Sequence, residues 1–282
     1  MSKFIEFYQY IPFQINPEIV WIGPFSFGWY AMMYLVAFLV VYFLLKKRLA
    51  LGEGKLSKSQ LFDFLIFCFI GVVVGARLGY VFFYNFFYYI SNPLAIISPF
   101  DLSTGNLVGI YGMSYHGGLI GAIIFAIIFT RRNKLKFWDL IDFSVPAIPA
   151  GYFFGRLGNF LNGELYGRVT EKWWGMYFPD DELHLLRHPS QLYEAFLEGI
   201  VVFIFLWTIR NSKVFQGKLA AIYLCAYATA RFFGEFYREP DSQIGFLFFG
   251  LTLGQIFSVI MFFSGLGIMF WKKIKKWYNV KR

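Results

Sequence analysis

Seven long apolar runs constrain this chain more than any other feature of its sequence. They lie at residues 26–45, 61–84, 112–130, 139–161, 192–210, 217–236 and 247–271. A helix needs about 20 apolar residues to cross a bilayer, and only helices and closed barrels satisfy their backbone polar groups inside it. The sequence therefore predicts an all-α polytopic membrane protein with seven transmembrane helices.

The composition agrees with a membrane protein. Of the 282 residues, 58% are hydrophobic and only 15% are charged, which is too apolar for an ordinary soluble domain. A net charge of +9 could indicate nucleic-acid binding, but the basic residues form short clusters between the apolar runs. We therefore expect one integral membrane domain over residues 1–282 and no nucleic-acid partner.

The basic clusters also predict an orientation. They follow the first, third, fifth and seventh runs, so that every alternate loop is basic. Because Lys and Arg are enriched in cytoplasmic loops, the N-terminus is expected outside and the C-terminus in the cytoplasm. The first 25 residues lack the pattern of a cleaved leader, so insertion through the helices themselves is expected. Residues 85–111, with Asp101, and residues 162–191 would lie outside, and 162–191 is expected to form a small extracytoplasmic cap.

Polar side chains gather at the ends of the runs that this topology places outside. A charged side chain near the hydrocarbon costs about 2.5 to 3.5 kcal/mol on insertion scales, so it is usually kept for a partner, a pathway or a ligand. Arginines gathered at one depth indicate an anionic ligand, and a phospholipid phosphate suits the guanidinium fork. The residues concerned are Tyr30, Arg77, Tyr80, His116, Arg156, Asn159, Glu164, Glu194, Arg231, Glu235 and Arg238.

Helical spacing groups some of these residues. Tyr227, Arg231, Glu235 and Arg238 would share one face of the sixth expected helix. Arg231 and Glu235 alone could equally be an internal ion pair without a ligand. Arg156 and Asn159 would share a face of the fourth helix, where the glycines let another helix approach closely: Gly151, Gly155 and Gly158.

The histidines and cysteines do not indicate a metal or redox site. His116 alone is more typical of a histidine that hydrogen-bonds between helices than of a base, and Gly117 beside it suits either a ligand or close packing. The other histidines are isolated, and Cys68 and Cys225 lie in apolar runs as small hydrophobes do. We expect no cofactor and no metal.

Short motifs that follow one another along the chain carry a family resemblance. The chain resembles the prolipoprotein diacylglyceryl transferases, bacterial inner-membrane enzymes that move a diacylglyceryl group from phosphatidylglycerol to the lipobox cysteine of lipoprotein precursors. The motifs are Trp29-Tyr30, Gly75–Tyr80, Tyr115–Gly121, Gly155–Gly167 (GRLGNFLNGELYG), His188–Glu194 (HPSQLYE) and Arg231–Asp241 (RFFGEFYREPD).

The resemblance implies the chemistry. The lipobox thiol would attack the glyceryl carbon, form a thioether and release glycerol phosphate, so the nucleophile belongs to the substrate. Arg156 and Arg231 would contact the phosphate, and Asn159 and Glu164 would hold the headgroup region. Proton transfer would fall to His116 or to a tyrosine, Tyr30 or Tyr227, and this choice stays open.

The resemblance also implies a wider site and a location. Glu235 would orient Arg231 or Arg238, and Gly155 and Gly167 would permit backbone approach to lipid or cap. The site would face the extracytoplasmic side of the inner membrane, where it meets phosphatidylglycerol, the lipobox and membrane lipids. The expected substrate-binding residues are Tyr30, Arg77, Tyr80, Asn159, Glu164, Glu194, Glu235, Arg238, Gly155 and Gly167.

Two other classes of membrane protein compete with an enzyme. A secondary transporter or flippase would also place paired charges in a helical bundle, but it would favour the midplane and interrupted, duplicated halves. A structural or assembly protein would explain the apolar packing but not the arginines at one depth.

Overall fold

The computed structural model describes residues 3–23, 25–100, 105, 112–240 and 245–280. Asp101 and Asp241, both noted in the sequence, lie outside these residues. The chain is mostly helical, at 66%, which confirms the predicted helical character. It divides into two compact units, Met1–Leu45 with Ile141–Arg282, and Lys46–Leu140, and each is described by itself.

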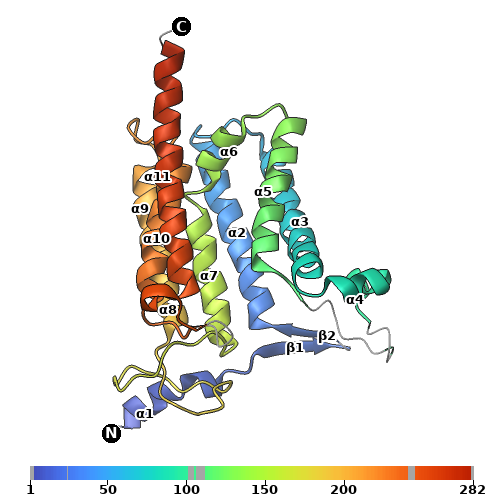
Figure 1. Ribbon diagram of the computed structural model, residues 1–282, viewed down its shortest axis with the longest axis vertical. Coiled ribbons are helices and arrows are strands. Elements are labelled where there is room, and N and C mark those ends of the chain that lie inside the picture. Colours follow the sequence, from blue (N-terminus) through green and yellow to red (C-terminus); the bar gives the residue numbers. More distant parts are fainter. Residues whose placement is uncertain (1–2, 24, 101–104, 106–111, 241–244, 281–282) are drawn as a thin grey trace. The chain divides into compact units, whose positions relative to one another are not determined.

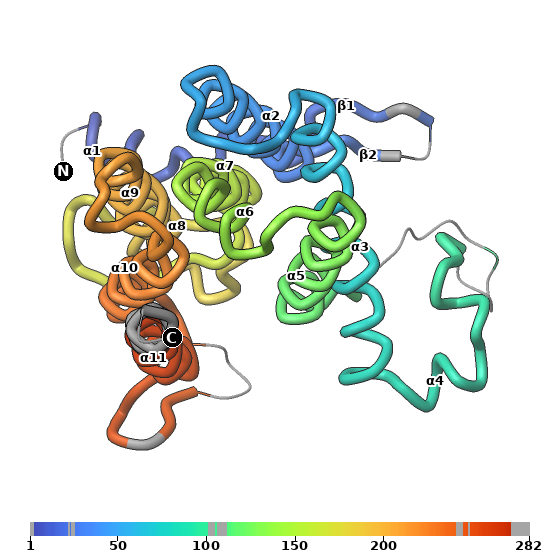
Figure 2. The backbone as a smooth tube through the Cα atoms, turned by 90° about the horizontal axis from the view of Figure 1, so that it is seen from above, coloured from blue at the N-terminus to red at the C-terminus, as the bar shows by residue number. Residues whose placement is uncertain are grey.

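The first unit holds most of α2 and a group of helices from the second half of the chain (Figures 1 and 2). Helices α10 and α11 lie side by side, and α7 packs against the α8–η3–α9 segment. The bounds are α2 Trp29–Ala50, α7 Ile148–Leu161, α8 Ser190–Glu194, η3 Ala195–Val201, α9 Val202–Ile209, α10 Leu219–Gly234, η4 Phe248–Gly250 and α11 Leu253–Val280.

The N-terminal residues form structure that the sequence analysis did not predict. A helix and a 3-10 turn precede a two-stranded antiparallel hairpin in which Trp21 pairs with Ser26. Gly23 ends the first strand with a φ of 60°, which glycine adopts without strain. The elements are α1 Lys3–Gln9, η1 Ile11–Gln14, β1 Glu18–Ile22 and β2 Phe25–Gly28.

The fourth apolar run is broken, so the prediction of one continuous helix over residues 139–161 is wrong. Helix α6 (Phe137–Ser144) ends before a short turn, and α7 begins at Ile148. Pro146 lies in the turn. Proline has no N–H to donate, and its ring clashes with the carbonyl four residues earlier, so the helix cannot continue through it.

The second unit is built on a close helix pair. Helix α3 (Lys58–Phe83) packs along α5 (Tyr115–Arg132), and α4 (Phe86–Ser91) and η2 (Pro93–Ile96) follow α3. A Cβ at Gly79 would lie 2.8 Å from the Gly117 Cα, and one at Gly117 would clash with the Gly75 carbonyl. Of the two roles open for Gly117, the structure supports close packing.

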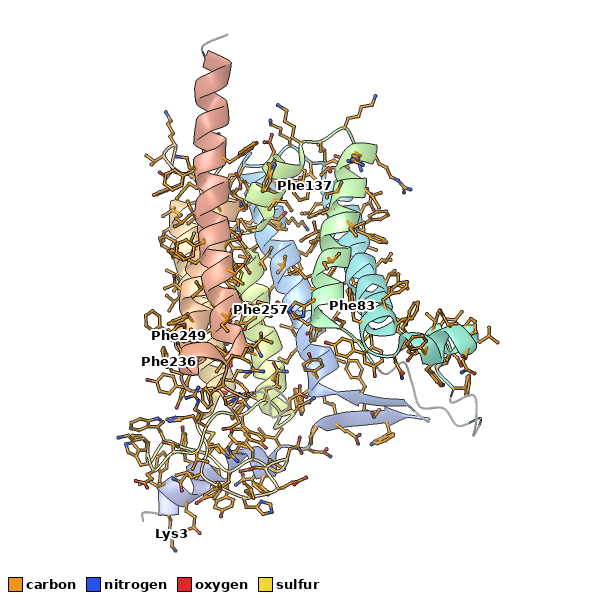
Figure 3. The ribbon with its side chains drawn as sticks, in the orientation of Figure 1. Lys3, Phe83, Phe137, Phe236, Phe249 and Phe257 are labelled. Atoms are coloured by element: carbon orange, nitrogen blue, oxygen red, sulfur yellow. The ribbon has the colours of Figure 1, made fainter. Side chains whose placement is uncertain are left out.

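Among the residues that the structure describes, four helical segments are long and apolar enough to cross a membrane: Trp29–Ala50, Lys58–Phe83, Ser190–Ile209 and Leu253–Trp271. Large apolar side chains such as Phe83 and Phe249 are exposed on the outside of the helices (Figure 3). Exposed apolar surface of this extent is typical of contact with lipid. The count of seven spans and the orientation of the termini stay predictions.

Candidate functional site

A buried cluster of ionised side chains lies where α7, α8, η3 and α10 meet. Three arginines face three glutamates, so the cluster is close to charge balance. The glutamate side chains are 0 to 4% exposed and those of the arginines 13 to 15%. Charges buried this deeply require partners. The members are Arg156, Glu194, Glu198, Arg231, Glu235 and Arg238.

Glu194 is the centre of the cluster. Its Oε2 lies 2.9 Å from Arg156 Nε and accepts a hydrogen bond from Arg231 Nη1, also at 2.9 Å. Its Oε1 accepts a bond of 3.4 Å from Arg238 Nη1. One carboxylate from α8 therefore holds the arginines of α7 and α10 together.

Glu235 ties the end of α10 to the start of α11. It pairs with Arg231 Nη2, and Arg238 Nε lies 3.9 Å from its Oε1. The Thr252 hydroxyl donates to Glu235 Oε2 at 2.9 Å. The pairing of Arg231 with Glu235 that helical spacing predicted is present, within a larger network.

Two members of the network were missed in the sequence, Tyr152 and Glu198. The Tyr152 hydroxyl donates to Glu198 Oε2 at 2.5 Å, and Arg156 Nε donates to the Tyr152 hydroxyl at 2.6 Å. Tyr152 precedes Arg156 by four residues, and Glu198 follows Glu194 by four. Each therefore lies one helical turn from a residue that the sequence analysis had selected, so the same spacing argument could have identified both.

The other edge of Arg156 meets residues of the motif Gly155–Gly167, which we call the signature motif. Its Nη1 donates to Asn159 Oδ1 at 3.3 Å, and Asn159 Nδ2 donates to Glu164 Oε1 at 2.8 Å. Tyr30 also interacts with the Asn159 side chain. The structure thus brings together the predicted residues Tyr30, Arg156, Asn159 and Glu164.

The glycines of α7 differ in what surrounds them. Cβ atoms at Gly151 and Gly158 would lie 2.9 Å from Val41 and 3.2 Å from Met33, so both positions let α2 approach. A Cβ at Gly155 would meet nothing within 4 Å. Gly155 therefore does not serve helix packing, and the space at its Cβ position is open.

Gly167 has a structural requirement of its own. A Cβ there would clash with the Tyr237 carbonyl and lie 2.7 Å from the carbonyl of His188. The Gly167 N–H donates to that His188 carbonyl at 2.8 Å, and Arg168 N–H donates to the Tyr237 carbonyl at 2.9 Å. The segment that follows the signature motif is thereby fixed against the residues that follow α10.

The segment 162–191 has a small core and an internal ion pair. Met176 and Phe178 of the segment are buried together with Phe160 of α7. Arg187 makes two bonds of 2.8 Å to Asp181. Burial raises the pKa of Asp181, but the bonds from Arg187 and from the Leu185 N–H outweigh it and bring that pKa below its ordinary value.

Helix α1 and the turn after it cover part of this segment. The Tyr177 N–H donates to the Gln9 carbonyl at 2.9 Å, and Gln9 Nε2 donates to the Trp173 carbonyl at 3.1 Å. The rings of Tyr10 and Tyr177 stack with their centroids 4.8 Å apart. The N-terminal residues therefore stabilise the segment that follows the signature motif.

Three predicted site residues belong to the second unit. Arg77 donates to the backbone carbonyls of Ala95 and Ile96, both at 2.7 Å. Tyr80 stacks on Tyr84, and His116 lies exposed in the first turn of α5. That these three residues share one site with Arg156 stays a prediction. Tyr227, a candidate for proton transfer, lies in the first unit, where its ring centroid is 5.6 Å from that of Tyr152.

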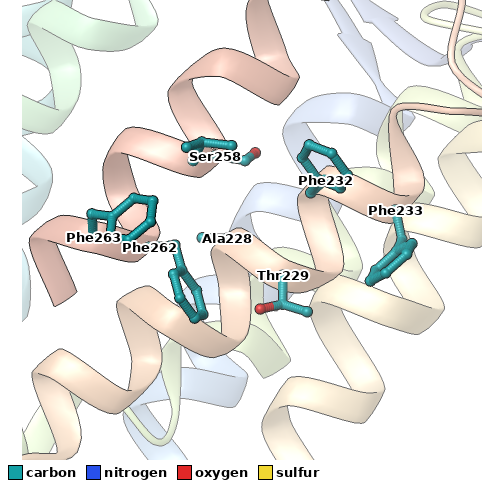
Figure 4. Close-up of a pocket in the computed structure, with 8 residues that line it drawn as sticks. Ala228, Thr229, Phe232, Phe233, Ser258, Phe262 and Phe263 are labelled. Carbon is teal, nitrogen blue, oxygen red and sulfur yellow. The ribbon is translucent and has the colours of Figure 1, made fainter. Parts of the chain in front are cut away.

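An apolar groove runs between α10 and α11 (Figure 4). Its volume is about 210 Å³. Arg231 lies on α10 between groove residues of that helix, so the groove adjoins the helix that carries the ion cluster. The lining residues are Ala228, Thr229, Phe232, Phe233, Ser258, Val259, Phe262 and Phe263.

The described part of the chain contains no group of three His, Cys, Asp or Glu side chains that could hold a metal ion. In the arginine–glutamate cluster the guanidinium groups are more exposed than the carboxylates, so they are the part of the cluster that an anion could reach.

Comparison with known proteins places the chain among relatives. A family model described as prolipoprotein diacylglyceryl transferase matches residues 17–271. A protein of Chlorobaculum tepidum named phosphatidylglycerol–prolipoprotein diacylglyceryl transferase is 47% identical over 275 residues, which cover 97% of this chain and 95% of that protein. Proteins of the same name from Campylobacter jejuni and Rickettsia bellii are each 44% identical to this chain. The match to the Campylobacter jejuni protein covers 96% of this chain and 99% of that protein. The match to the Rickettsia bellii protein covers 89% of this chain and 93% of that protein.

Proposed function

The chain belongs to the prolipoprotein diacylglyceryl transferase family, and on this premise we propose that it transfers the diacylglyceryl group of phosphatidylglycerol to the lipobox cysteine of prolipoproteins. The thiol sulfur forms a bond to the glyceryl carbon. The bond between that carbon and the phosphate oxygen breaks, its electron pair leaves with the oxygen, and glycerol phosphate is released.

The buried arginine–glutamate cluster carries this proposal. Arg156 uses Nε and Nη1 for its hydrogen bonds to Tyr152 and Asn159, so Nη2 and the second Nη1 hydrogen can serve a phosphate. Arg231 Nη1 contacts the same Glu194 oxygen, Oε2, as Arg156 Nε does, so the two guanidinium groups are held together. Guanidinium groups fixed in advance, in a place with little water, stabilise the charge that develops on a departing phosphate.

The substrate thiol must also lose a proton. A free thiol has a pKa near 8.5, and neighbouring guanidinium groups favour the thiolate. His116, Tyr30 and Tyr227 remain the candidates for the group that accepts the proton. Of these, Tyr30 and Tyr227 adjoin the network directly, through Asn159 and Tyr152.

Lipidation of a peptide tests the proposed function. Purified protein in detergent is incubated with phosphatidylglycerol and a lipobox peptide, and the mass of the peptide is measured by mass spectrometry. We expect a gain of one diacylglyceryl group, and none on the matched peptide with serine in place of cysteine. A transporter or an assembly protein would leave both peptides unchanged, and that result would refute the proposal.

The α10–α11 groove offers a place for an acyl chain of the lipid. The groove is apolar and adjoins the helix of Arg231. Thr229 is an exposed lining residue, and Thr208 on α9 is an exposed threonine outside the groove. Thr229→Trp should lower turnover about tenfold by filling the groove, whereas Thr208→Trp should leave turnover within about twofold. Equal turnover in the two variants would exclude this role.

We further propose that the protein lies in the bacterial inner membrane with its site toward the extracytoplasmic side, where residues 162–191 act as a cap. Single cysteines in a cysteine-free background test this orientation. Glu182 is exposed in that segment, and Ser59 and Lys213 are exposed in or near two basic loops. Glu182→Cys should react with an impermeant maleimide in sealed cells, and the other two only after the membrane is opened. The reverse pattern would invert the topology.

A further inference from the structure

Glu198 is the least satisfied carboxylate of the buried cluster. Its side chain is 0% exposed. Its Oε2 accepts from the Tyr152 hydroxyl, but its Oε1 accepts no hydrogen bond from the described residues and lies 3.6 Å from Arg231 Nη1. A buried carboxylate oxygen without a donor is costly, so its retention calls for a role.

The backbone around Glu198 is specialised. Residues Ala195–Val201 form a π-helix, a rare winding that is frequent at functional sites. Gly199 lies within it, and a Cβ there would lie 2.8 Å from the Phe153 Cβ and 3.0 Å from the Phe153 Cα. The π-helix and Gly199 together let this segment approach α7 at the residue next to Tyr152.

The direction of the hydrogen bonds that join Glu198 to Arg156 is fixed. A guanidinium only donates and an ionised carboxylate only accepts, whereas a tyrosine hydroxyl does both. Arg156 Nε therefore donates to the Tyr152 hydroxyl at 2.6 Å, and that hydroxyl donates to Glu198 at 2.5 Å. The Nε edge of Arg156 is held by this chain and by Glu194 Oε2 at 2.9 Å, and Nη1 is held separately by Asn159 at 3.3 Å.

We propose that Tyr152 and Glu198 are positioning residues that orient Arg156 toward an anionic phosphodiester. Glu198 fixes the hydroxyl of Tyr152, and this hydroxyl fixes the guanidinium plane so that Nη2 stays available. The proposal rests on the proposed function for its reaction, but the orientation of Arg156 also governs the binding of the lipid without any reaction.

Activity in four variants tests the chain of contacts. Tyr152→Phe removes the hydroxyl but keeps the ring, and it should lower kcat/KM about 10- to 100-fold. Glu198→Leu removes the acceptor and should cause a similar loss. Glu198→Gln keeps an acceptor oxygen and should stay within about threefold of wild type. The double variant Tyr152→Phe/Glu198→Leu should have a kcat/KM no lower than that of the less active single variant, because both residues act through the same chain of hydrogen bonds.

Matched controls and a second measurement separate positioning from folding. Glu182→Gln and Tyr10→Phe change the same residue types at exposed positions, and Tyr10→Phe keeps the ring that stacks on Tyr177, so both should keep wild-type activity. The rise in melting temperature on adding phosphatidylglycerol, relative to phosphatidylcholine, reports lipid binding alone. We expect this rise in wild type and Glu198→Gln, and a loss of most of it in Tyr152→Phe.

The outcomes distinguish this proposal from the proposed function. If the wild-type protein shows the rise in melting temperature with phosphatidylglycerol but lipidates no peptide, the proposed transferase function is refuted. Loss of that rise in Tyr152→Phe would still support the positioning role of Tyr152. Wild-type activity and a wild-type rise in Tyr152→Phe would overturn positioning. Losses that multiply in the double variant, or equal losses in Glu198→Gln and Glu198→Leu, would overturn it as well.

Discussion

Arg156 Nε lies 2.9 Å from Glu194 Oε2, so the arginine of the signature motif is joined to a carboxylate of α8 whose side chain is 0% exposed. A phosphate that approaches Arg156 thus meets a guanidinium already in place. Preorganised charge of this kind avoids the cost of reorganising the site when the leaving group departs.

Arg156→Lys should reduce kcat/KM by about 100-fold or more, nearly as far as Arg156→Ala, because a lysine cannot make the separate contacts of a planar fork. Arg156 contacts both Tyr152 and Glu194 through Nε, and Asn159 through Nη1. Peptide lipidation by variants with confirmed expression measures the effect, with the exposed Arg132→Lys as control. Near-normal turnover by Arg156→Lys would rule out the bidentate role.

Gly155→Ala and Gly158→Ala should differ in kind. A Cβ at Gly155 meets open space, so the protein should keep its melting temperature but lose activity about 10- to 100-fold if that space takes the headgroup. A Cβ at Gly158 would lie 3.2 Å from the Met33 Cβ. Gly158→Ala should therefore lower the free energy of unfolding by about 1 to 3 kcal/mol, and with it the melting temperature. Full activity in Gly155→Ala would argue that the headgroup lies elsewhere.

Much of this site could be predicted from the sequence, because the cost of burying charge limits what an arginine in an apolar run can do. That cost, with helical spacing, indicated the arginines, Glu194 and Glu235 as partners. The break at Pro146 follows from proline chemistry and could have been predicted. The π-helix could not, since its backbone pattern depends on the approach of α7 at Gly199 rather than on local propensity.

The cysteines should be dispensable. Cys225 packs against Gly265 and donates to the Phe262 carbonyl at 3.5 Å, and Cys68 lies in the apolar α3. Because the proposed mechanism takes the attacking sulfur from the substrate, Cys68→Ala/Cys225→Ala should keep activity within about twofold. Mass spectrometry of wild type incubated with phosphatidylglycerol alone should show no added mass. A diacylglyceryl adduct on either cysteine would replace direct displacement with a two-step mechanism.

The Asp181–Arg187 pair should make the segment 162–191 sensitive to acid. The pKa of Asp181 is lowered from 3.8 in the folded protein, so its stabilisation is present above that value and is lost as the pH falls through the folded pKa. Proteolysis within the segment should therefore increase as the pH falls below the ordinary pKa of an aspartate, about 3.9.

Asp181→Asn should remove this acid step and lower stability at neutral pH by about 3 kcal/mol, because it leaves the buried Arg187 without its main partner. The exposed Glu182→Gln serves as the control and should behave as wild type. An unchanged acid step in Asp181→Asn would assign the sensitivity to another group.

The fate of one oxygen atom tests the central claim most directly. Phosphatidylglycerol is labelled with ¹⁸O at the oxygen between the diacylglyceryl carbon and phosphorus. It is incubated with purified protein and a lipobox peptide, and the masses of the products are measured by mass spectrometry. Attack of the thiol on the glyceryl carbon predicts a lipidated peptide without label and an equal amount of glycerol phosphate that carries all of it. Label in released diacylglycerol or in the peptide, or no lipidated peptide, would contradict the account.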